Sequence, residues 1–365
     1  MPTAAWINQP DALQHYLAEH LPHTPLGLDT EFMYQNTFYP QLALLQIAYQ
    51  NRFALIDPLA LNISDSLHPA LEDTNSIVIM HSAGEDLKAL SPFLPAGPGN
   101  LFDTQIAAAF AGMGMGLSYR ALVATLVGVE LDKGETRSDW MRRPLTASQL
   151  SYATLDVVHL ESLYIQLSHT LQQRGYSAWH MQDCQRLKQR INRPPDPQPQ
   201  HSFRSAAVWP HNTQARLRRI LLWRDTQARA LNRPRPWLLE DALVLSLAEQ
   251  PPDSLAQLNR RIRGQRALGA TQASALFEVL TTPPDTDEMA STIPIPAILK
   301  GEEKQALTTM RRCVEQRATE LNLPAGLLCP RKILETYVVT RQWLDFLSGW
   351  RLDILKEDLS SILPD

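Results

Sequence analysis

The sequence predicts a mixed α/β sheet domain followed by two all-helical modules. Three apolar strand-like runs follow one another closely within residues 26–56, a pattern typical of an antiparallel meander. Strand-like and helical segments then alternate as far as residue 171, which favours a sheet with helices packed against it. A proline-rich stretch begins at Arg193, and helical patterns alone follow it. The 365 residues are enough for two or three domains of ordinary size.

Composition and charge narrow the class of protein. Hydrophobic residues make up 44% of the chain and charged residues 20%, which indicates a globular protein in water. The formal net charge is −4, so any surface for nucleic acid must be local. The dispersed cysteines, Cys184, Cys313 and Cys329, form no CxxC pair, which argues against a zinc knuckle or a disulfide framework. No apolar run approaches the ~20 residues of a membrane helix, and the first residues lack a secretory signal, so we expect a cytoplasmic protein.

The periodicity of the first half predicts its elements in order. Strands are expected over residues 26–32, 42–49, 53–56, 77–80 and 101–103. Helices are expected over residues 6–20, 82–90, 104–111, 119–126 and 146–171. The polar pair Gln50-Asn51 suits a hairpin turn between the second and third strands.

Asp29 and Glu31 lie two residues apart in the first of these strands. Successive side chains of a strand alternate between its faces, so both carboxylates project to the same side. Two neighbouring anions repel each other, and a hard divalent cation is the usual partner of such a pair. A solvated strand face with two unrelated acids is the alternative interpretation of this stretch by itself.

Asp86 is a third acid that follows a predicted strand. Ser82 and Glu85 form the pattern of a capping box, which places Asp86 in the first turns of a helix, beyond the carboxyl end of the strand. Ligand sites of open α/β sheets favour that edge, although acids are common near helix starts for dipole reasons. Asp103 is expected to cap the helix that begins at Thr104.

Tyr152 and Asp156 lie four residues apart on the last helix of this half, which a capping box of Thr146 and Gln149 begins. The two side chains therefore share one face. Apolar residues surround Asp156 in the sequence, which predicts a largely buried helix. A buried carboxylate needs a partner, so a simple surface pair is the weaker interpretation.

Two stretches rich in helix-breaking residues divide the second half of the chain. Four prolines within residues 194–199 predict a stiff, extended linker, and a second breaker-rich stretch covers residues 282–296. Between Arg204 and Arg235 there are eight arginines and one acid, Asp225. These arginines either contact phosphates or form solvated helix faces paired with acids, and the shortage of acids favours phosphate contacts.

The acids and the tyrosine now form one pattern: Asp29-x-Glu31, then Asp86, then Tyr152-x-x-x-Asp156. This pattern resembles the DEDD superfamily of 3′-to-5′ exonucleases, in the subgroup with a tyrosine in its third motif. The three motifs together are specific, whereas a match to the helical HRDC module described below would be weak by itself.

Further segments resemble the ribonuclease D family. They are the run from Tyr39 to Gln46, the run from His81 to Asp86, and residues 131–140. The arginine-rich module is similar to an HRDC domain, a helical nucleic-acid-binding module. The third module resembles the more divergent HRDC-like domain of the same family, so the resemblance covers nearly the whole chain.

The resemblance implies a domain plan. It comprises a 3′-to-5′ exonuclease domain with a ribonuclease H-like mixed sheet over residues 1–192, a proline-rich linker over 193–204, an HRDC domain over 205–283, a linker over 284–299 and a second HRDC-like helical domain over 300–365.

The resemblance also implies a chemistry. Two divalent ions, Mg²⁺ or Mn²⁺, would be held by four carboxylates, with Asp29 between both ions. Glu31 and Asp156 would complete one ion site, and Asp86 would help to position the other ion. Tyr152 would orient the attacking water. The expected reaction removes 5′-mononucleotides from the 3′ ends of tRNA precursors and other structured RNAs.

Several side chains are predicted to bind the substrate. Phe32 and Met33 follow the acidic strand and suit stacking on terminal bases. The other members of this set are Gln46, His81, Lys133, Arg137, Arg224 and Arg229.

Two other functions stay open at this point. A DNA 3′-exonuclease would use the same four carboxylates, since this motif does not sense the 2′-hydroxyl. An inactive nucleic-acid-binding scaffold is the second alternative, and a missing carboxylate would be its signature. We expect RNA as the partner, with no membrane and no obligate protein partner.

Overall fold

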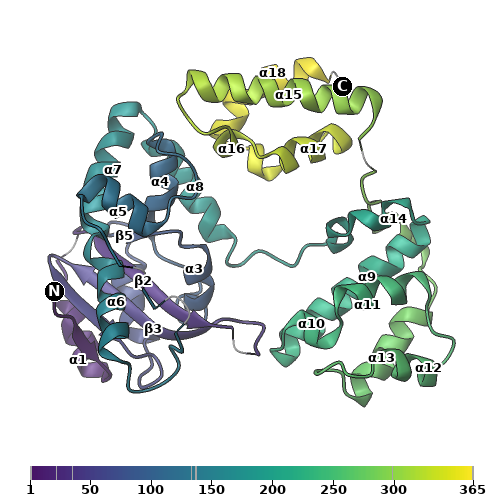
Figure 1. Cartoon of the computed structure of the whole chain (residues 1–365), viewed down its shortest axis with the longest axis horizontal. Helices are drawn as coiled ribbons and strands as arrows, with labels where there is room; N and C mark the ends of the chain where they lie inside the picture. Colours follow the sequence, from purple (N-terminus) through teal and green to yellow (C-terminus); the bar gives the residue numbers. More distant parts are fainter. Residues whose placement is uncertain are drawn as a thin grey trace. The chain divides into compact units, whose positions relative to one another are not determined.

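The computed structural model describes residues 2–21, 23–34, 36–132, 134–135, 138–297 and 299–363 (Figure 1). The predicted substrate residues Lys133 and Arg137 lie outside these ranges. The chain forms two compact units. Unit 1 comprises Met1–Met33, Pro40–Arg193 and Glu302–Asp365, and unit 2 comprises Tyr34–Tyr39 and Pro194–Gly301.

A six-stranded mixed sheet forms the centre of unit 1, with the order β1-β4-β3-β2-β5-β6. The central strands β2, β3 and β4 are antiparallel neighbours, whereas β1 pairs parallel with β4, and β5 and β6 extend the sheet in parallel beyond β2. The strands are β1 Ala5–Ile7, β2 Leu26–Met33, β3 Gln41–Tyr49, β4 Arg52–Ile56, β5 Ile77–Met80 and β6 Asn100–Asp103. The predicted meander and the mixed α/β class are thereby confirmed.

Helices cover both faces of this sheet. They are α1 Pro10–Ala18, α2 Ser64–Leu71, α3 Gly84–Leu90, α4 Thr104–Phe110, α5 Tyr119–Val127, α6 Ala147–Val158, α7 Leu160–Arg174 and α8 Ser177–Gln189. Leu28, Leu45 and Ile47 belong to the larger core, which includes side chains of α1, α2 and α3. Leu44 and Leu55 point to the other face, where they pack with Ala153 of α6. Figure 1 shows α6 crossing in front of the sheet.

The first predicted helix is shorter than expected. Residues 5–7 form the edge strand β1, and the helix begins only at Pro10, whose fixed φ suits a first helical position. The hairpin turn is confirmed, because Gln50 and Asn51 both have positive φ, 48° and 61°. Two consecutive residues with positive φ are the requirement of a type I′ turn.

The long helix predicted over residues 146–171 is divided at His159 into α6 and α7. The hydroxyl of Tyr119 explains the break. It donates to the carbonyl oxygen of Leu155 at 3.1 Å and accepts from the backbone N–H of His159 at 3.1 Å. These two backbone groups would bond each other in a continuous helix, so a side chain from α5 replaces one step of the helical ladder.

The capping box predicted at Ser82 is wrong, because α3 has no side-chain cap and Ser82 has a positive φ of 58°. Asp103 supplies the missing acceptors. Its carboxylate accepts from the backbone N–H groups of Ser82 and Ala83, and also from Gln105 and Ile106 in the first turn of α4. The predicted role of Asp103 as the cap of α4 is confirmed, and the same side chain also fixes the start of α3.

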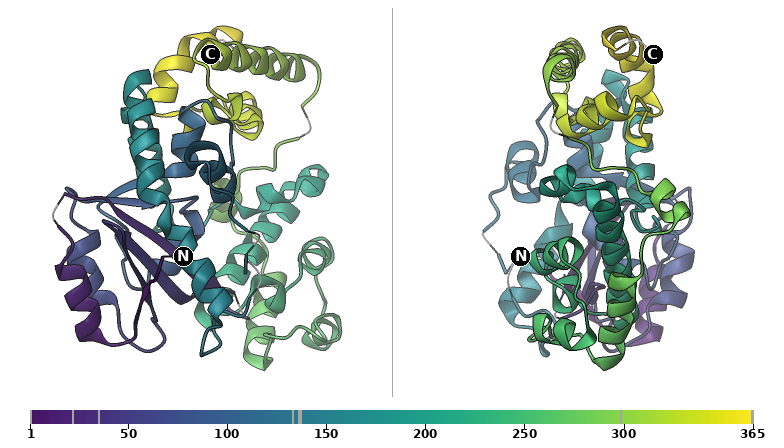
Figure 2. Two further views of the ribbon diagram at one scale, coloured as in Figure 1. Left: turned by 60° about the vertical axis from the view of Figure 1, so that its left-hand side comes forward. Right: turned by 90° about the vertical axis from the view of Figure 1, so that its right-hand side faces the viewer.

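The third helical module packs against the nuclease sheet domain as part of unit 1. Its elements are α15 Gly301–Glu320, α16 Ala325–Leu328, α17 Arg331–Thr340, the 3₁₀ turn η3 Asp345–Leu347 and α18 Trp350–Ile362. The Trp350 ring stacks on Trp179 of α8 at 4.7 Å between centroids. Arg351, whose side chain is 2% exposed, donates two hydrogen bonds of 2.6 Å to the carboxylate of Asp183. Figure 2 shows this C-terminal module beside the helices of the nuclease domain.

Unit 2 is helical apart from its connections. Its elements are η1 Pro199–Ser202, η2 Arg204–Val208, α9 His211–Leu231, α10 Arg235–Leu238, α11 Asp241–Glu249, α12 Leu255–Arg261, α13 Ala270–Thr281 and α14 Thr286–Ser291. Leucine and isoleucine side chains of α9, α11, α12 and α13 form one core. Helix α14 lies inside the segment predicted as a second linker.

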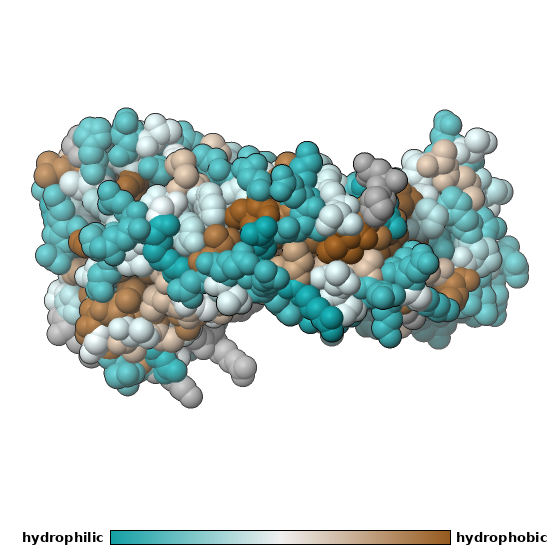
Figure 3. All heavy atoms as spheres, turned by 90° about the horizontal axis from the view of Figure 1, so that it is seen from above, coloured by the Kyte–Doolittle hydropathy of each residue, from teal (hydrophilic) through white to brown (hydrophobic). Residues whose placement is uncertain are grey.

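None of the helices in the described ranges is long and apolar enough to cross a membrane. The face of the molecule seen in Figure 3 is mostly hydrophilic, with apolar residues gathered in small patches.

Candidate active site

The acids of strand β2 lie beside a gap between β2 and β5 in the sheet, which we call the notch. Strand β2 pairs with β5 only through Leu26 and Gly27, so its second half has β3 on one side and no strand of the described chain on the other. Asp29 and Glu31 lie in that second half and alternate with Thr30, which points away from them. A register shift follows Glu31, where β2 bends relative to β3.

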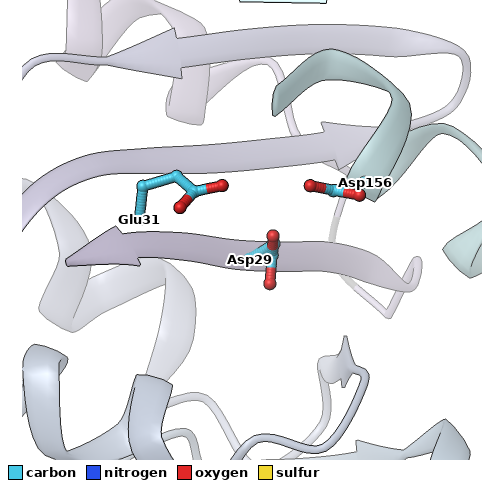
Figure 4. A group of neighbouring side chains, drawn as sticks. All are labelled: Asp29, Glu31 and Asp156. Atoms are coloured by element: carbon cyan, nitrogen blue, oxygen red, sulfur yellow. The ribbon is translucent and has the colours of Figure 1, made fainter. Parts of the chain in front are cut away.

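Helix α6 brings the fourth acid of the motif to these two. One carboxylate oxygen each of Asp29, Glu31 and Asp156 lie within 4.8 Å of one another, and all three residues are half-buried. Figure 4 shows the three side chains converging on one point, two from the strand and one from the helix above it. The capping box of Thr146 and Gln149 is present, so the start of the helix that carries Asp156 is fixed as the sequence predicts.

Asp86 enters the notch from α3. It is buried, and its Oδ1 accepts a hydrogen bond of 2.5 Å from the Thr30 hydroxyl. Its charge acts on Asp29, Glu31 and Asp156. Thr30 thus connects the acidic strand to the helix that carries Asp86, a role that no local sequence pattern indicates.

The four carboxylates destabilise one another's charged forms. Burial, followed by the charges of Asp86, Asp156 and Glu31, raises the pKa of Asp29 well above its ordinary value. Burial, followed by the charges of Asp156 and Asp86, raises the pKa of Glu31 to about 9.

The pKa values of the other two acids, Asp156 and Asp86, are also raised. Burial raises the pKa of Asp156 to about 7 and that of Asp86 to about 6. Hydrogen bonding lowers both pKa values in part, from Tyr152 in one case and from Thr30 in the other. These shifts mean that the ionised group lacks a compensating positive charge.

The donor set fits divalent cations. Lysine and arginine side chains form no ion pair with these four acids within the described ranges. All the available ligand atoms are carboxylate oxygens, which Mg²⁺ and Mn²⁺ prefer. Two observations favour a cation at this site. Three of the acids converge, and the described part of the chain supplies no cationic side chain to pair with them.

Tyr152 lies one helical turn before Asp156 and is confined on two sides. The ring of the buried Trp140 lies 6.0 Å from its ring, measured between centroids. Gly134 lies against its other edge, since a Cβ at that position would lie 1.6 Å from Cδ2 of Tyr152. The segment of Gly134 is tied to α6 by Glu135, which accepts a hydrogen bond of 2.5 Å from the Ser148 hydroxyl.

Two predicted substrate residues differ in burial, since Gln46 has no exposed surface and His81 is partly exposed. Gln46 is fully buried in β3, directly across from Asp29. His81 uses both ring nitrogens internally, with the Thr104 hydroxyl at 2.9 Å and the Leu117 carbonyl at 3.1 Å. Their predicted contacts with the substrate stay predictions.

Phe32 and Met33 leave β2 on opposite faces. Met33 shares the face of Asp29 and Glu31 and packs beside Tyr152, whereas Phe32 packs on the larger core. Met33 therefore lies on the same face as the acids, and Phe32 lies on the opposite face. The stacking of these two side chains on terminal bases stays a prediction.

The arginines of unit 2 are engaged more fully than the sequence indicated. Arg224 is buried and bonds the Leu239 carbonyl and the Asp241 carboxylate, each within 2.8 Å. Arg229 pairs with Asp225 at 2.7 Å. Arg224 is therefore held by partners inside this unit, and its contact with RNA stays a prediction.

Two family models match this chain. One is described as a 3′-5′ exonuclease and matches residues 4–172, and the other is the HRDC domain, which matches residues 213–268. The mixed sheet with its four carboxylates, joined to an HRDC module, defines a 3′-to-5′ exonuclease.

Full-length relatives specify the family. The chain is 38% identical to ribonuclease D of Xanthomonas oryzae pv. oryzae, over 98% of each chain, and 32% identical to ribonuclease D of Pseudomonas paraeruginosa, over 99% of this chain and 98% of the relative. The fold matches the crystal structure of Escherichia coli RNase D with a TM-score of 0.82 and 26% identity, over 99% of this chain and 98% of that one. The chain belongs to the ribonuclease D family, and it is an exoribonuclease.

Proposed function

We propose that this exoribonuclease removes nucleotides one at a time from the 3′ ends of structured RNAs such as tRNA precursors. The observation that carries the proposal is the convergence of Asp29, Glu31 and Asp156, with Asp86 adjacent and Tyr152 held above them. The RNA class is supported by the family and by Escherichia coli RNase D, which is described as an exoribonuclease involved in structured RNA processing.

Asp29, Glu31, Asp86 and Asp156 would hold two divalent ions, Mg²⁺ or Mn²⁺. Such a pair of ions supplies an activated water and stabilises the charge on the leaving oxygen. Thr30 holds the Asp86 carboxylate in place through its hydroxyl. The buried α6 helix holds Asp156 and Tyr152 on one face, so that the phenol hydroxyl can orient the attacking water.

Arginines at the end of α12 are the better candidates for phosphate contacts in unit 2. Arg260, Arg263 and Arg266 are exposed, and within the described part of the chain none of them pairs with an acid. Arg266 lies over the Trp237 ring at 5.2 Å, which places a cation beside an aromatic face. Cations and aromatic rings together are typical of surfaces that hold single-stranded nucleic acid. We place the protein in the cytoplasm, in keeping with three free cysteines.

The decisive experiment uses a 3′-labelled tRNA precursor and a matched single-stranded DNA. The wild-type protein should release labelled mononucleotide from the RNA in Mg²⁺ or Mn²⁺ and none in EDTA. Asp29→Asn should lose this activity while keeping its circular dichroism spectrum. Activity that persists in EDTA, or in the Asn variant, would contradict the metal site.

The measurement on the single-stranded DNA tests the alternative that the protein is a DNA 3′-exonuclease. Faster hydrolysis of the DNA than of the RNA would favour a DNA 3′-exonuclease, because the carboxylates themselves do not distinguish the two sugars.

A further inference from the structure

Gln46 is an exception to the rule that buried polar groups are bonded. It lies at the middle of β3 with no exposed surface, and neither Nε2 nor Oε1 has a hydrogen-bond partner among the described residues. A primary amide offers two donors and an acceptor, so this residue buries several unmet hydrogen-bonding groups. A glutamine in such a position is destabilising unless something that binds to the folded protein satisfies it.

The strand register identifies what lies beside that amide. Gln46 is the cross-strand partner of Asp29 on β2, and partners in an antiparallel pair project to the same face. Its other cross-strand neighbour is Leu55, and Leu44 precedes it on the same face. Both leucines belong to the apolar cluster under α6, so they offer the amide no polar partner. Asp29 is the polar neighbour that the register places next to it.

A buried glutamine with a purely structural role would differ from Gln46. Gln214, a second buried glutamine, illustrates the contrast, because it donates to the Ala207 and Trp209 carbonyls and accepts from the N–H of Ile295. Its amide has partners at both ends. Among the described residues the amide of Gln46 has none, and it is the one placed beside a metal-binding carboxylate.

We propose that Gln46 is a positioning residue of the metal site. With a cation bound at the acids, the Gln46 amide would hydrogen-bond the Asp29 carboxylate, its cross-strand neighbour, and thereby orient that ligand. This inference rests on the proposed function, because it requires a cation at Asp29. It replaces the predicted contact between Gln46 and RNA. Groups that orient metal ligands from behind typically change metal affinity by about 10- to 100-fold.

The test compares thermal unfolding and Mn²⁺ titration of three variants: Gln46→Met, Gln46→Leu and, as the matched control, Gln214→Met. In EDTA both Gln46 variants should melt at or above the wild-type temperature, because an unmet amide is replaced by an apolar side chain of similar size. With Mn²⁺ they should bind about tenfold more weakly or worse by calorimetry. Gln214→Met should melt lower than wild type in EDTA and keep its Mn²⁺ affinity.

Either of two results would overturn the inference. One is a decrease in stability in EDTA equal to that of Gln214→Met, which would give Gln46 a structural role. The other is wild-type Mn²⁺ affinity in both Gln46 variants. If the wild-type protein itself takes up no Mn²⁺, the proposed metal site fails first, and the inference fails with it.

Discussion

Gly134 limits the space around the ring of Tyr152. A methyl group there would lie 1.6 Å from one ring carbon and 1.8 Å from the next, so no side chain fits without moving the tyrosine. Trp140 confines the ring from another direction. A hydroxyl that must orient water benefits from such confinement, since its position determines the geometry of attack.

Gly134→Ala should therefore lower kcat without weakening RNA or metal binding. The methyl group displaces the Tyr152 ring, and a displacement of about 1 Å typically costs about 100-fold in rate. Single-turnover kinetics on a labelled RNA would measure the decrease. Gly269→Ala is the control, because its methyl group meets only the flexible end of Gln272. A wild-type rate for Gly134→Ala would show that this segment does not position the tyrosine.

At this scale the sequence predicted which acids come together, but it did not predict the residues that hold them in place. Asp29 and Glu31 were identifiable because a strand places alternate residues on one face, and Tyr152 and Asp156 because a helix places fourth neighbours together. The roles of Thr30 and Gly134 depend on segments distant in the sequence, and no local periodicity signals such approaches.

The acids also make the stability of the metal-free protein depend on pH. The folded chain raises the pKa of Glu31 from 4.5 to about 9, so between these values it keeps a proton that the unfolded chain releases. The contribution of Glu31 to the free energy of unfolding is then largest below about pH 4.5 and falls as the pH rises toward 9.

We expect the melting temperature in EDTA to decrease from about pH 5 to about pH 9, and the decrease to be smaller in Glu31→Gln. Saturating Mn²⁺ should reverse most of it, because bound cations compensate the ionised carboxylates. Differential scanning fluorimetry across the pH series measures this, with the exposed Glu130→Gln as the control. A melting temperature that rises over the same interval would contradict the assignment of the uncompensated charges.

Helices α8 and α18 pack against each other within unit 1. The domain plan predicted from the sequence placed them in two separate domains. Local patterns predicted α18 correctly as a helix in a module after a breaker-rich stretch. They could not show that Arg351 finds Asp183, far away in the sequence, or that Trp350 stacks on Trp179. The arginine count failed for the same reason, since acids beyond residue 235 pair with arginines of α9.

Arg351→Met should destabilise unit 1 by about 3–5 kcal/mol, because it leaves the Asp183 carboxylate buried without its partner. The double variant Asp183→Leu with Arg351→Met should recover much of this stability. Arg317→Met is the matched control, since its pair with Asp358 is 43% and 27% exposed and solvent screening should leave its removal with little effect. Urea unfolding would resolve the three, and equal effects of Arg351→Met and Arg317→Met would show that the buried pair does not join the two elements.

For the whole molecule, negative and positive side chains gather in different units. The catalytic sheet gathers acids without cationic partners in the described chain, whereas exposed arginines lie at the end of α12 in unit 2. A net charge of −4 conceals this division, because it sums opposite local fields. In the proposed function, the exposed arginines bind the RNA phosphates and the carboxylates of unit 1 carry out the hydrolysis.

Arg260→Gln combined with Arg263→Gln should weaken the binding of a tRNA precursor. The log–log slope of Kd against salt should decrease by about 0.7–0.9 for each phosphate that is no longer neutralised. The rate at saturating RNA should stay the same, since the carboxylates are untouched. Arg312→Gln combined with Arg341→Gln removes the same formal charge from exposed positions of unit 1 and should change the slope little. Equal slopes in both double variants would place the RNA-holding surface elsewhere.

The docking of α18 on α8 also sets an order of events during synthesis. The ribosome delivers the sheet first, then residues 194–301 of unit 2, and only afterwards the residues that pair with Asp183 and stack on Trp179. Domains generally fold as their residues emerge, but unit 1 cannot close until its C-terminal segment arrives. A chain released early, with the sheet complete and α18 missing, therefore exposes an aromatic surface and a carboxylate without its arginine. We expect such a fragment to be digested by protease faster than the full chain, because the surface that α18 covers is then open to solvent.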